Sequence, residues 1–183
     1  MRGRENIPVH AIWLAQDDPK KNTAVRLSRR GELKLHEKFN NLPRRGIILE
    51  PLCGKVLGPE DHSLLLEERG SLVGLDCSWA QIESSVDQVM KRTKLKGRML
   101  PLLLAANPVN WGKPSKMTTA EALAASLYLI GREEQARQLL SAFRWGEQFF
   151  ILNKEPLEAY RGAKSSSELV DLQFEFFDIP RSE

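Results

Sequence analysis

The chain has 183 residues, of which 42% are hydrophobic and 28% charged, a composition that indicates a folded globular domain and excludes a disordered chain. No stretch approaches the roughly 18 apolar residues of a membrane-spanning helix, and no apolar signal core follows the basic N-terminus, so we expect a cytoplasmic protein. Two cysteines and three histidines without ligand spacing predict no disulfide framework and no metal site.

Charge is divided unevenly along the chain. Residues 1–116 carry 20 Lys or Arg against 13 Asp or Glu, whereas residues 117–183 carry 7 against 11. A basic half and an acidic half are typical of a protein that meets a polyanion with one face. A solvated surface with uneven charge has the same pattern, so charge alone leaves nucleic-acid binding undecided.

The first part of the chain alternates predicted strands and helices. Runs that are apolar throughout, rather than alternating, suit a sheet covered on both faces. Ile82, Val86 and Met90 recur every four residues and predict an amphipathic crossover helix over 80–93. The apolar runs predict strands at four places: 9–14, 47–49, 72–75 and 102–105.

The sequence becomes helical after residue 112. Thr118-Thr119-Ala120-Glu121 is a capping box before a helix that ends at Gly131, and Ser165-Ser166-Ser167-Glu168 is a second box that opens the last helix. Two further helices are expected over 133–143 and 146–152. The sequence thus predicts two lobes: an α/β lobe with a basic surface over 1–105 and a mostly helical lobe over 106–183.

Polar and aromatic side chains follow the predicted strand at 72–75. In α/β folds ligands bind at the carboxyl ends of strands. Asp76 is therefore a candidate for accepting a proton or holding an amine, and Trp79 for stacking on a flat ring. The alternative is that Asp76 or Ser78 caps the next helix and Trp79 belongs to the core. No glycine-rich phosphate-binding motif is found, so a Rossmann-type site is not expected.

Two further segments suit a ligand or a nucleic acid. Residues 105–114 form a loop rich in Asn, Pro and Gly whose backbone groups suit an adenine edge, although a stiff connection between lobes has the same composition. A group of basic residues suits RNA phosphates, with a solvated helix end as the alternative. This group comprises Arg26, Arg29, Arg30, Arg44, Arg45, Lys91, Arg92, Lys94, Lys96 and Arg98.

Four ordered motifs resemble those of the ribosomal RNA aminocarboxypropyltransferase family of archaea and eukaryotes. They are GLDCSWAQI at 74–82, RMLPLLLAANPVNWGKP at 98–114, TTAEALAASLYLIG at 118–131 and the aromatic pattern from Phe143 to Tyr160. The motifs are long and in the expected order, and the resemblance extends over about residues 8–162. The lack of a long charged C-terminal tail is similar to the archaeal form.

The resemblance implies a SPOUT-like fold with a deep trefoil knot, a monomeric protein, and S-adenosylmethionine as cofactor between the lobes. It implies that Leu75 binds the ribose and that Leu100 and Ser115 meet the adenine edge through main-chain groups. Asp76 is expected beside the reacting centre. Apolar walls are expected from Leu49, Pro51, Trp79 and Ala122, and contacts to the amino-acid part from Thr23 and Thr119. The chain departs from the family pattern at Asn22-Thr23-Ala24, at Glu50 and at Ser115.

The implied reaction is transfer of the 3-amino-3-carboxypropyl group to N3 of a uridine or N1-methylpseudouridine in small-subunit (16S/18S) rRNA. The partner is then the pre-ribosome, and the process is ribosome biogenesis. Two alternatives stay open. A SPOUT-type RNA methyltransferase would use the same cofactor and a different carbon, and a pre-ribosome RNA-binding factor would use no cofactor.

Overall fold

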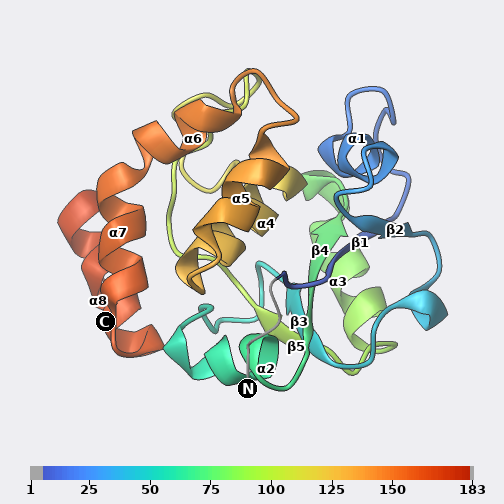
Figure 1. Ribbon diagram of the computed structural model, residues 1–183, viewed down its shortest axis with the longest axis horizontal. Helices are drawn as coiled ribbons and strands as arrows, with labels where there is room; N and C mark the ends of the chain where they lie inside the picture. Colours follow the sequence, from blue (N-terminus) through green and yellow to red (C-terminus); the bar gives the residue numbers. More distant parts are fainter. Residues whose placement is uncertain (1–5, 182–183) are drawn as a thin grey trace.

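The apolar runs at 47–49 and 72–75 lie at the centre of a five-stranded sheet in the computed structural model, which describes residues 6–181 (Figure 1). The strand order is β2-β1-β4-β3-β5 and every pairing is parallel, so all carboxyl ends lie at one edge. The strands are β1 Val9–Trp13, β2 Lys34–His36, β3 Gly46–Leu49, β4 Ser71–Asp76 and β5 Lys96–Arg98.

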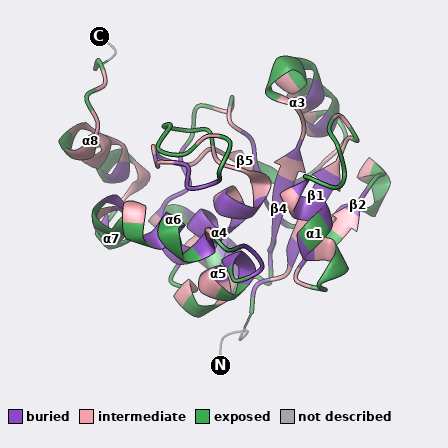
Figure 2. Ribbon diagram, turned by 90° about the horizontal axis from the view of Figure 1, so that it is seen from above, coloured by how far each residue is buried: buried purple, intermediate pink, exposed green. Residues whose placement is uncertain are grey.

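Helices cover both faces of this sheet (Figure 2). Helix α4 packs against β4, α1 and α5 on one face, and α3 packs on the other, while α7 and α8 lie away from the sheet (Figure 1). Between residues 6 and 181 we find no helix with the length and apolarity that crossing a membrane requires. The helices are α1 Thr23–Arg29, α2 His62–Leu66, α3 Ile82–Met90, α4 Thr119–Leu129, α5 Glu133–Leu140, α6 Gly146–Leu152, α7 Lys154–Gly162 and α8 Ser166–Phe176.

Two clusters of buried side chains explain the continuous apolar runs. Ile47 and Leu72 belong to the cluster on the α4 face, and their neighbours Ile48 and Val73 belong to the cluster on the α3 face, together with Val89. The central strands are thus buried on both sides, as the sequence predicted. The larger cluster combines side chains from both predicted lobes, so the two parts share one core and the division near residue 105 stays a prediction.

Most predicted elements are confirmed to within a few residues. The strands predicted at 9–14, 47–49 and 72–75 are β1, β3 and β4, and the crossover helix is α3. The helices predicted after each capping box are α4 and α8, and those predicted over 133–143 and 146–152 are α5 and α6. Elements α1, β2, α2 and α7 were not predicted, because their apolar positions are few or belong to short segments.

The strand predicted at 102–105 is wrong. The fifth strand is the polar segment β5, and the chain leaves the sheet after it to run along the C-terminal helices. Side chains of those helices replace the strand ladder there: Asn153 bonds both the N–H and the C=O of Leu104, and the Tyr160 hydroxyl donates to the Leu102 carbonyl at 3.0 Å. The Gln173 side-chain oxygen Oε1 accepts from the Leu102 N–H at 2.7 Å. The Leu103 carbonyl accepts from the Ser115 N–H and the Ala105 N–H donates to the Lys113 carbonyl, so this segment also pairs with the returning 113–115 stretch in an isolated antiparallel bridge.

Candidate functional site

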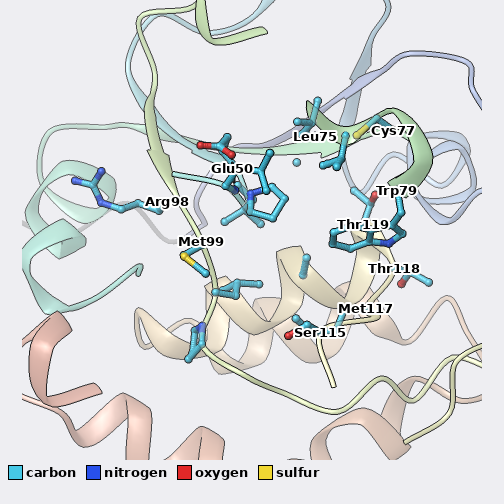
Figure 3. A pocket seen from close by; sticks show the side chains of 18 residues that line it. Glu50, Leu75, Cys77, Trp79, Arg98, Met99, Ser115, Met117, Thr118 and Thr119 are labelled. Atoms are coloured by element: carbon cyan, nitrogen blue, oxygen red, sulfur yellow. Dashed lines mark hydrogen bonds between the residues drawn. The ribbon is translucent and has the colours of Figure 1, made fainter. Parts of the chain in front are cut away.

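A pocket of about 310 Å³ lies at the carboxyl edge of the sheet (Figure 3). Its walls come from the segments that follow β3, β4 and β5 and from the start of α4, so the parallel topology brings together parts of the chain that are far apart in sequence. The lining residues are Leu49, Glu50, Pro51, Leu52, Gly74, Leu75, Cys77, Trp79, Ile82, Arg98, Met99, Leu100, Pro101, Ser115, Met117, Thr118, Thr119 and Ala122.

The pocket is mostly apolar and holds two charged side chains. The Arg98 guanidinium forms an ion pair with Asp61, with 2.9 Å between Nη2 and Oδ1, and both side chains are nearly buried. Glu50 is also buried, and its carboxylate accepts from the Leu52 N–H. Asp61 pairs with Arg98, so Glu50 is the charged lining side chain for which the described residues show no ion pair. Such a pocket fits a ligand with a flat apolar body and a positive charge, as S-adenosylmethionine has.

Eight of the nine predicted cofactor residues line this pocket. They come from all walls of the pocket: Leu49, Pro51, Leu75, Trp79, Leu100, Ser115, Thr119 and Ala122. Thr23 lies outside the lining, and its hydroxyl accepts from the Ala120 N–H at the start of α4. The Ser115 N–H already donates to the Leu103 carbonyl, which leaves the Ser115 carbonyl for a ligand. Direct contact of these residues with a cofactor stays a prediction.

Gly74 permits the close approach of α4 to β4. A Cβ at this position would lie 2.8 Å from Thr119 Cγ2 and 3.5 Å from both methyl carbons of Leu123. These contacts are with the first two turns of α4, whose start forms one wall of the pocket. The glycine of the GLDCSW segment is therefore needed for packing and for the shape of the site.

Gly74→Ala is expected to lower the free energy of unfolding by about 1–3 kcal/mol, because the added methyl overpacks the β4–α4 contact. Binding of S-adenosylmethionine, measured by calorimetry, is expected to weaken as Thr119 moves. Gly162→Ala is the matched control. Gly162 is the last residue of α7 with no atom within 4 Å of an added Cβ. It is expected to be neutral or stabilising by about 0.4–1 kcal/mol, and equal destabilisation by both substitutions would contradict this account.

Asp76 is a buried carboxylate directly behind the pocket wall. The Thr119 hydroxyl donates to its Oδ1 at 3.0 Å, and the Asn22 side-chain amide donates to its Oδ2. Burial raises the pKa of this carboxyl above its ordinary value, these two hydrogen bonds oppose the rise, and the charge of nearby Asp17 adds to it. A carboxylate of raised pKa beside a pocket has the properties of a general base.

The alternative interpretation of the 74–79 segment is confirmed only for the position of Ser78. Ser78 is the N-cap residue of the short 3₁₀ turn Trp79–Gln81, although its side chain makes no capping bond. The carboxylate of Asp76 bonds to Asn22 and Thr119 and does not cap a helix. Trp79 is 49% exposed and is not part of the core. Burial raises the pKa of the Cys77 thiol to about 11, so this thiol is protonated at neutral pH and unsuited to act as a nucleophile.

Asn22 is a site residue that the sequence reasoning missed. Its side-chain oxygen caps α1 by accepting from the Val25 N–H at 2.9 Å, and its amide group contacts the carboxylates of Asp17 and Asp76. An Asn before a helix is a common N-cap signal. The contact with Asp76 joins positions 54 residues apart, and no local pattern indicates it.

Glu121 is a second residue whose role the sequence did not show. It is fully buried, and its Oε1 accepts from the N–H groups of Ala106 and Asn107 at 2.6 and 3.1 Å. Its Oε2 accepts from the Asn107 amide at 2.9 Å, and from the N–H and hydroxyl of Thr118 at 2.7 and 3.0 Å. The capping glutamate thus also fixes both ends of the 106–118 loop that delivers Ser115 and Met117 to the pocket.

The predicted basic residues fall into two groups. Nine are exposed and lie on α1, between β2 and β3, and from the end of α3 to β5: Arg26, Arg29, Arg30, Arg44, Arg45, Lys91, Arg92, Lys94 and Lys96. Arg98 differs, because its side chain is only 11% exposed and paired with Asp61 in the pocket wall. Its assignment to the RNA-facing surface is therefore corrected to a structural ion pair of the pocket.

Known proteins are similar to this chain over almost its whole length. Residues 47–177 match the family described as ribosome biogenesis protein, C-terminal. The 16S rRNA aminocarboxypropyltransferase of Methanosarcina acetivorans is 40% identical over 168 residues, which are 92% of this chain and 93% of that protein. The protein of the same name from Methanopyrus kandleri is 45% identical over 159 residues, 87% of this chain and 92% of that protein.

A solved structure has the same fold as this chain. It is described as the SAM-dependent rRNA:acp-transferase Tsr3 from Vulcanisaeta distributa, and it is 36% identical with a TM-score of 0.80. The superposition covers 93% of this chain and 96% of that one. The resemblance seen in the sequence motifs and the α/β fold are thus confirmed. The chain belongs to the 16S rRNA aminocarboxypropyltransferase family.

Proposed function

We propose that this chain transfers the 3-amino-3-carboxypropyl group of S-adenosylmethionine to N3 of a uridine or N1-methylpseudouridine in small-subunit rRNA during ribosome biogenesis. The observation that carries the proposal is the apolar pocket that is lined by Glu50 and has the buried carboxylate of Asp76 behind it. The relatives and the structural neighbour named above support the same activity. The products would be methylthioadenosine and the modified RNA.

The residues of the pocket would act mainly by positioning. S-adenosylmethionine supplies a sulfonium leaving group with three carbons open to attack. Leu49, Pro51, Trp79 and Ala122 would hold the adenine, ribose and methyl groups out of water. Thr119 would hold the amino-acid part, so that the carbon of the aminocarboxypropyl chain, not the methyl, meets the base. Such positioning can supply about 7–11 kcal/mol of the barrier.

Asp76 would act as the base of this reaction. N3 of the uracil ring is a nucleophile only after it loses its proton. The Asp76 carboxylate would accept this proton, and its hydrogen bond from Thr119 keeps it next to the predicted cofactor site. Burial favours proton transfer, because it raises the pKa of this carboxyl toward neutrality.

Double labelling of the cofactor tests the reaction. The protein is incubated with small-subunit rRNA that lacks the modification and with S-adenosylmethionine labelled either on the carboxyl carbon or on the methyl carbon. Our proposal expects the carboxyl label, and no methyl label, in the RNA. The opposite result would identify a SPOUT-type methyltransferase. No label in the RNA and no binding of S-adenosylmethionine would identify a non-catalytic RNA-binding factor.

We further propose the arrangement that the resemblance implies: a monomeric cytoplasmic protein with a SPOUT-like deep trefoil knot formed where the 99–118 segment leads into α4. The α/β lobe over 1–105 would face the RNA, and the helical lobe over 106–183 would complete the cofactor cleft. After β5 at the edge of the sheet, the chain returns to the centre of the sheet, where α4 packs against β4. This path supports the proposal of a knot. Stretching single molecules from both termini tests this, because a knotted chain stays shorter than its contour length.

The exposed cations are expected to bind RNA phosphates without reading sequence. Replacing Lys94 and Lys96 with Gln is expected to weaken binding of single-stranded RNA and to reduce the slope of log K against log salt by up to about 1.4, at about 0.7 per phosphate contact. Filter binding at several salt concentrations measures this slope. The matched control replaces Lys154 and Lys164, exposed on the helical part of the chain, with Gln. An equal loss of slope in the control would argue against the predicted surface.

A further inference from the structure

Trp111 is an exposed aromatic residue on the loop that leads to Ser115 in the pocket lining, and no part of the proposed reaction uses it. It exposes 53% of its surface, and Val109 two positions earlier exposes 83%. Both lie in the 99–118 segment, which contains two lysines and no acidic residue. Large apolar side chains that are exposed together often mark a contact surface, and the charge of this segment favours an anionic partner.

The loop does not need the indole for its own structure. Its backbone is closed by hydrogen bonds from the Gly112 N–H to the Ala105 carbonyl at 2.7 Å and from the Lys113 N–H to the Asn110 carbonyl at 3.0 Å. The buried carboxylate of Glu121 holds the start of the loop through the N–H groups described above. An exposed ring on a loop fixed in this way is held in position for contact with another molecule.

The position of the loop links it to the reaction site. Ser115 lines the pocket and lies four residues after Trp111, so the two Cα atoms are at most about 14 Å apart. The Lys116 ammonium lies 5.0 Å from the centre of the Trp79 ring, which forms another wall of the pocket. Figure 3 shows Ser115 and Met117 on the side of the pocket below Trp79 and Thr119. The loop is thus the rim of the pocket.

We propose that Trp111 stacks on a nucleobase that flanks the target nucleotide in single-stranded RNA, and that Lys113 and Lys116 bind the neighbouring phosphates. A flat exposed ring on a segment with two lysines and no acidic residue matches the two parts of a nucleotide, its base and its phosphate. The inference rests on the proposed function, because it names how the RNA substrate of that same site is held.

Two substitutions of Trp111 test this inference with a single-stranded oligouridine as probe. Trp111→Ala is expected to weaken binding about tenfold, the effect of losing one stacked base. Trp111→Phe keeps a ring and is expected to retain most of the affinity. Stacking also quenches indole fluorescence, so RNA should quench the wild type and quench Trp111→Phe much less. Trp145→Phe, which removes the indole stacked on Phe143 at 4.8 Å, is the control and should keep the quenching.

The outcomes separate this inference from the proposed function. Unchanged RNA affinity in Trp111→Ala, or unchanged quenching in Trp111→Phe, would overturn the stacking role even if the wild type transfers the labelled aminocarboxypropyl group. If Trp111→Ala instead loses binding to purified small-subunit ribosomal proteins, the surface serves a protein partner and the inference is wrong. Loss of quenching in Trp111→Phe without any transfer by the wild type would support stacking and refute the proposed reaction. Unchanged binding of S-adenosylmethionine by Trp111→Ala shows that the fold is intact.

Discussion

Asp76→Asn is expected to lower kcat for aminocarboxypropyl transfer by about 10²–10⁴-fold, the usual contribution of a positioned general base. The substitution preserves shape, because the new amide can accept from Asn22 through its oxygen and donate to the Thr119 hydroxyl through its nitrogen. Binding of S-adenosylmethionine should therefore change by no more than a few-fold. Release of methylthioadenosine measures the rate, and calorimetry measures the affinity.

Asp17→Asn is the matched control for this result. Asp17 is exposed and also accepts from the Asn22 amide, so the substitution perturbs the same group of side chains without touching the proposed base. We expect kcat at neutral pH to fall far less than in Asp76→Asn, because the exposed Asp17 carboxylate accepts no proton in the proposed step. The charge of Asp17 raises the pKa of Asp76, so its removal should move the acidic limb of the pH–rate profile to lower pH. A shift to higher pH would contradict the assignment.

The free energy of unfolding of Asp76→Asn tests the raised pKa of Asp76 independently of the reaction rate. Because burial raises the folded-state pKa of Asp76 above its unfolded value, its ionised form destabilises the fold above that folded-state pKa. The Asn variant should then have an equal or higher free energy of unfolding at pH 7, and this advantage should disappear below the unfolded pKa of about 3.9. A carboxylate with a purely structural role would show the opposite sign. Denaturant titrations at several pH values measure this difference.

The sheet and the location of the site could be predicted from the sequence because the signals are local. The runs containing Ile47 and Leu72 are apolar at every position, which is the pattern of strands buried on both faces. The carboxyl ends of such strands are known ligand sites, so Asp76 and Trp79 could be selected before the structure was known. The motifs around them then identified the family.

The remaining features depend on contacts between distant residues. The β5 strand is polar and three residues long, while the apolar run after it bonds to the side chains of Asn153 before α7, Tyr160 of α7 and Gln173 of α8 and not to a strand of the sheet. Asn22 reaches Asp76 only because α1 and β4 meet at one edge of the sheet. In the sequence Arg98 belongs to a basic cluster, but in the structure it bonds to Asp61, 37 residues earlier, and lies in the pocket wall. No spacing rule in a single sequence reports such pairs.

Glu121→Gln is expected to lower the free energy of unfolding by about 2–4 kcal/mol. Both oxygens of the fully buried carboxylate accept from backbone N–H groups, so either orientation of a glutamine amide sets its NH₂ against at least one of them. Each buried N–H left without an acceptor costs about 1–3 kcal/mol, and the charge-assisted bonds are lost as well. Binding of S-adenosylmethionine should also weaken, because Thr118 and Ser115 line the pocket.

Glu168→Gln is the control that separates this effect from ordinary helix capping. Glu168 has the same position in its own Ser/Thr-x-x-Glu pattern at the start of α8, but it is exposed and accepts only from the Lys164 N–H among the described contacts. Glu168→Gln is expected to lower the free energy of unfolding by at most about 1 kcal/mol, and the affinity for S-adenosylmethionine should not change. Two patterns that are equivalent in the sequence would then differ severalfold in energy, because only Glu121 also fixes the loop at the rim of the pocket. Equal destabilisation by both substitutions would reduce Glu121 to a capping residue.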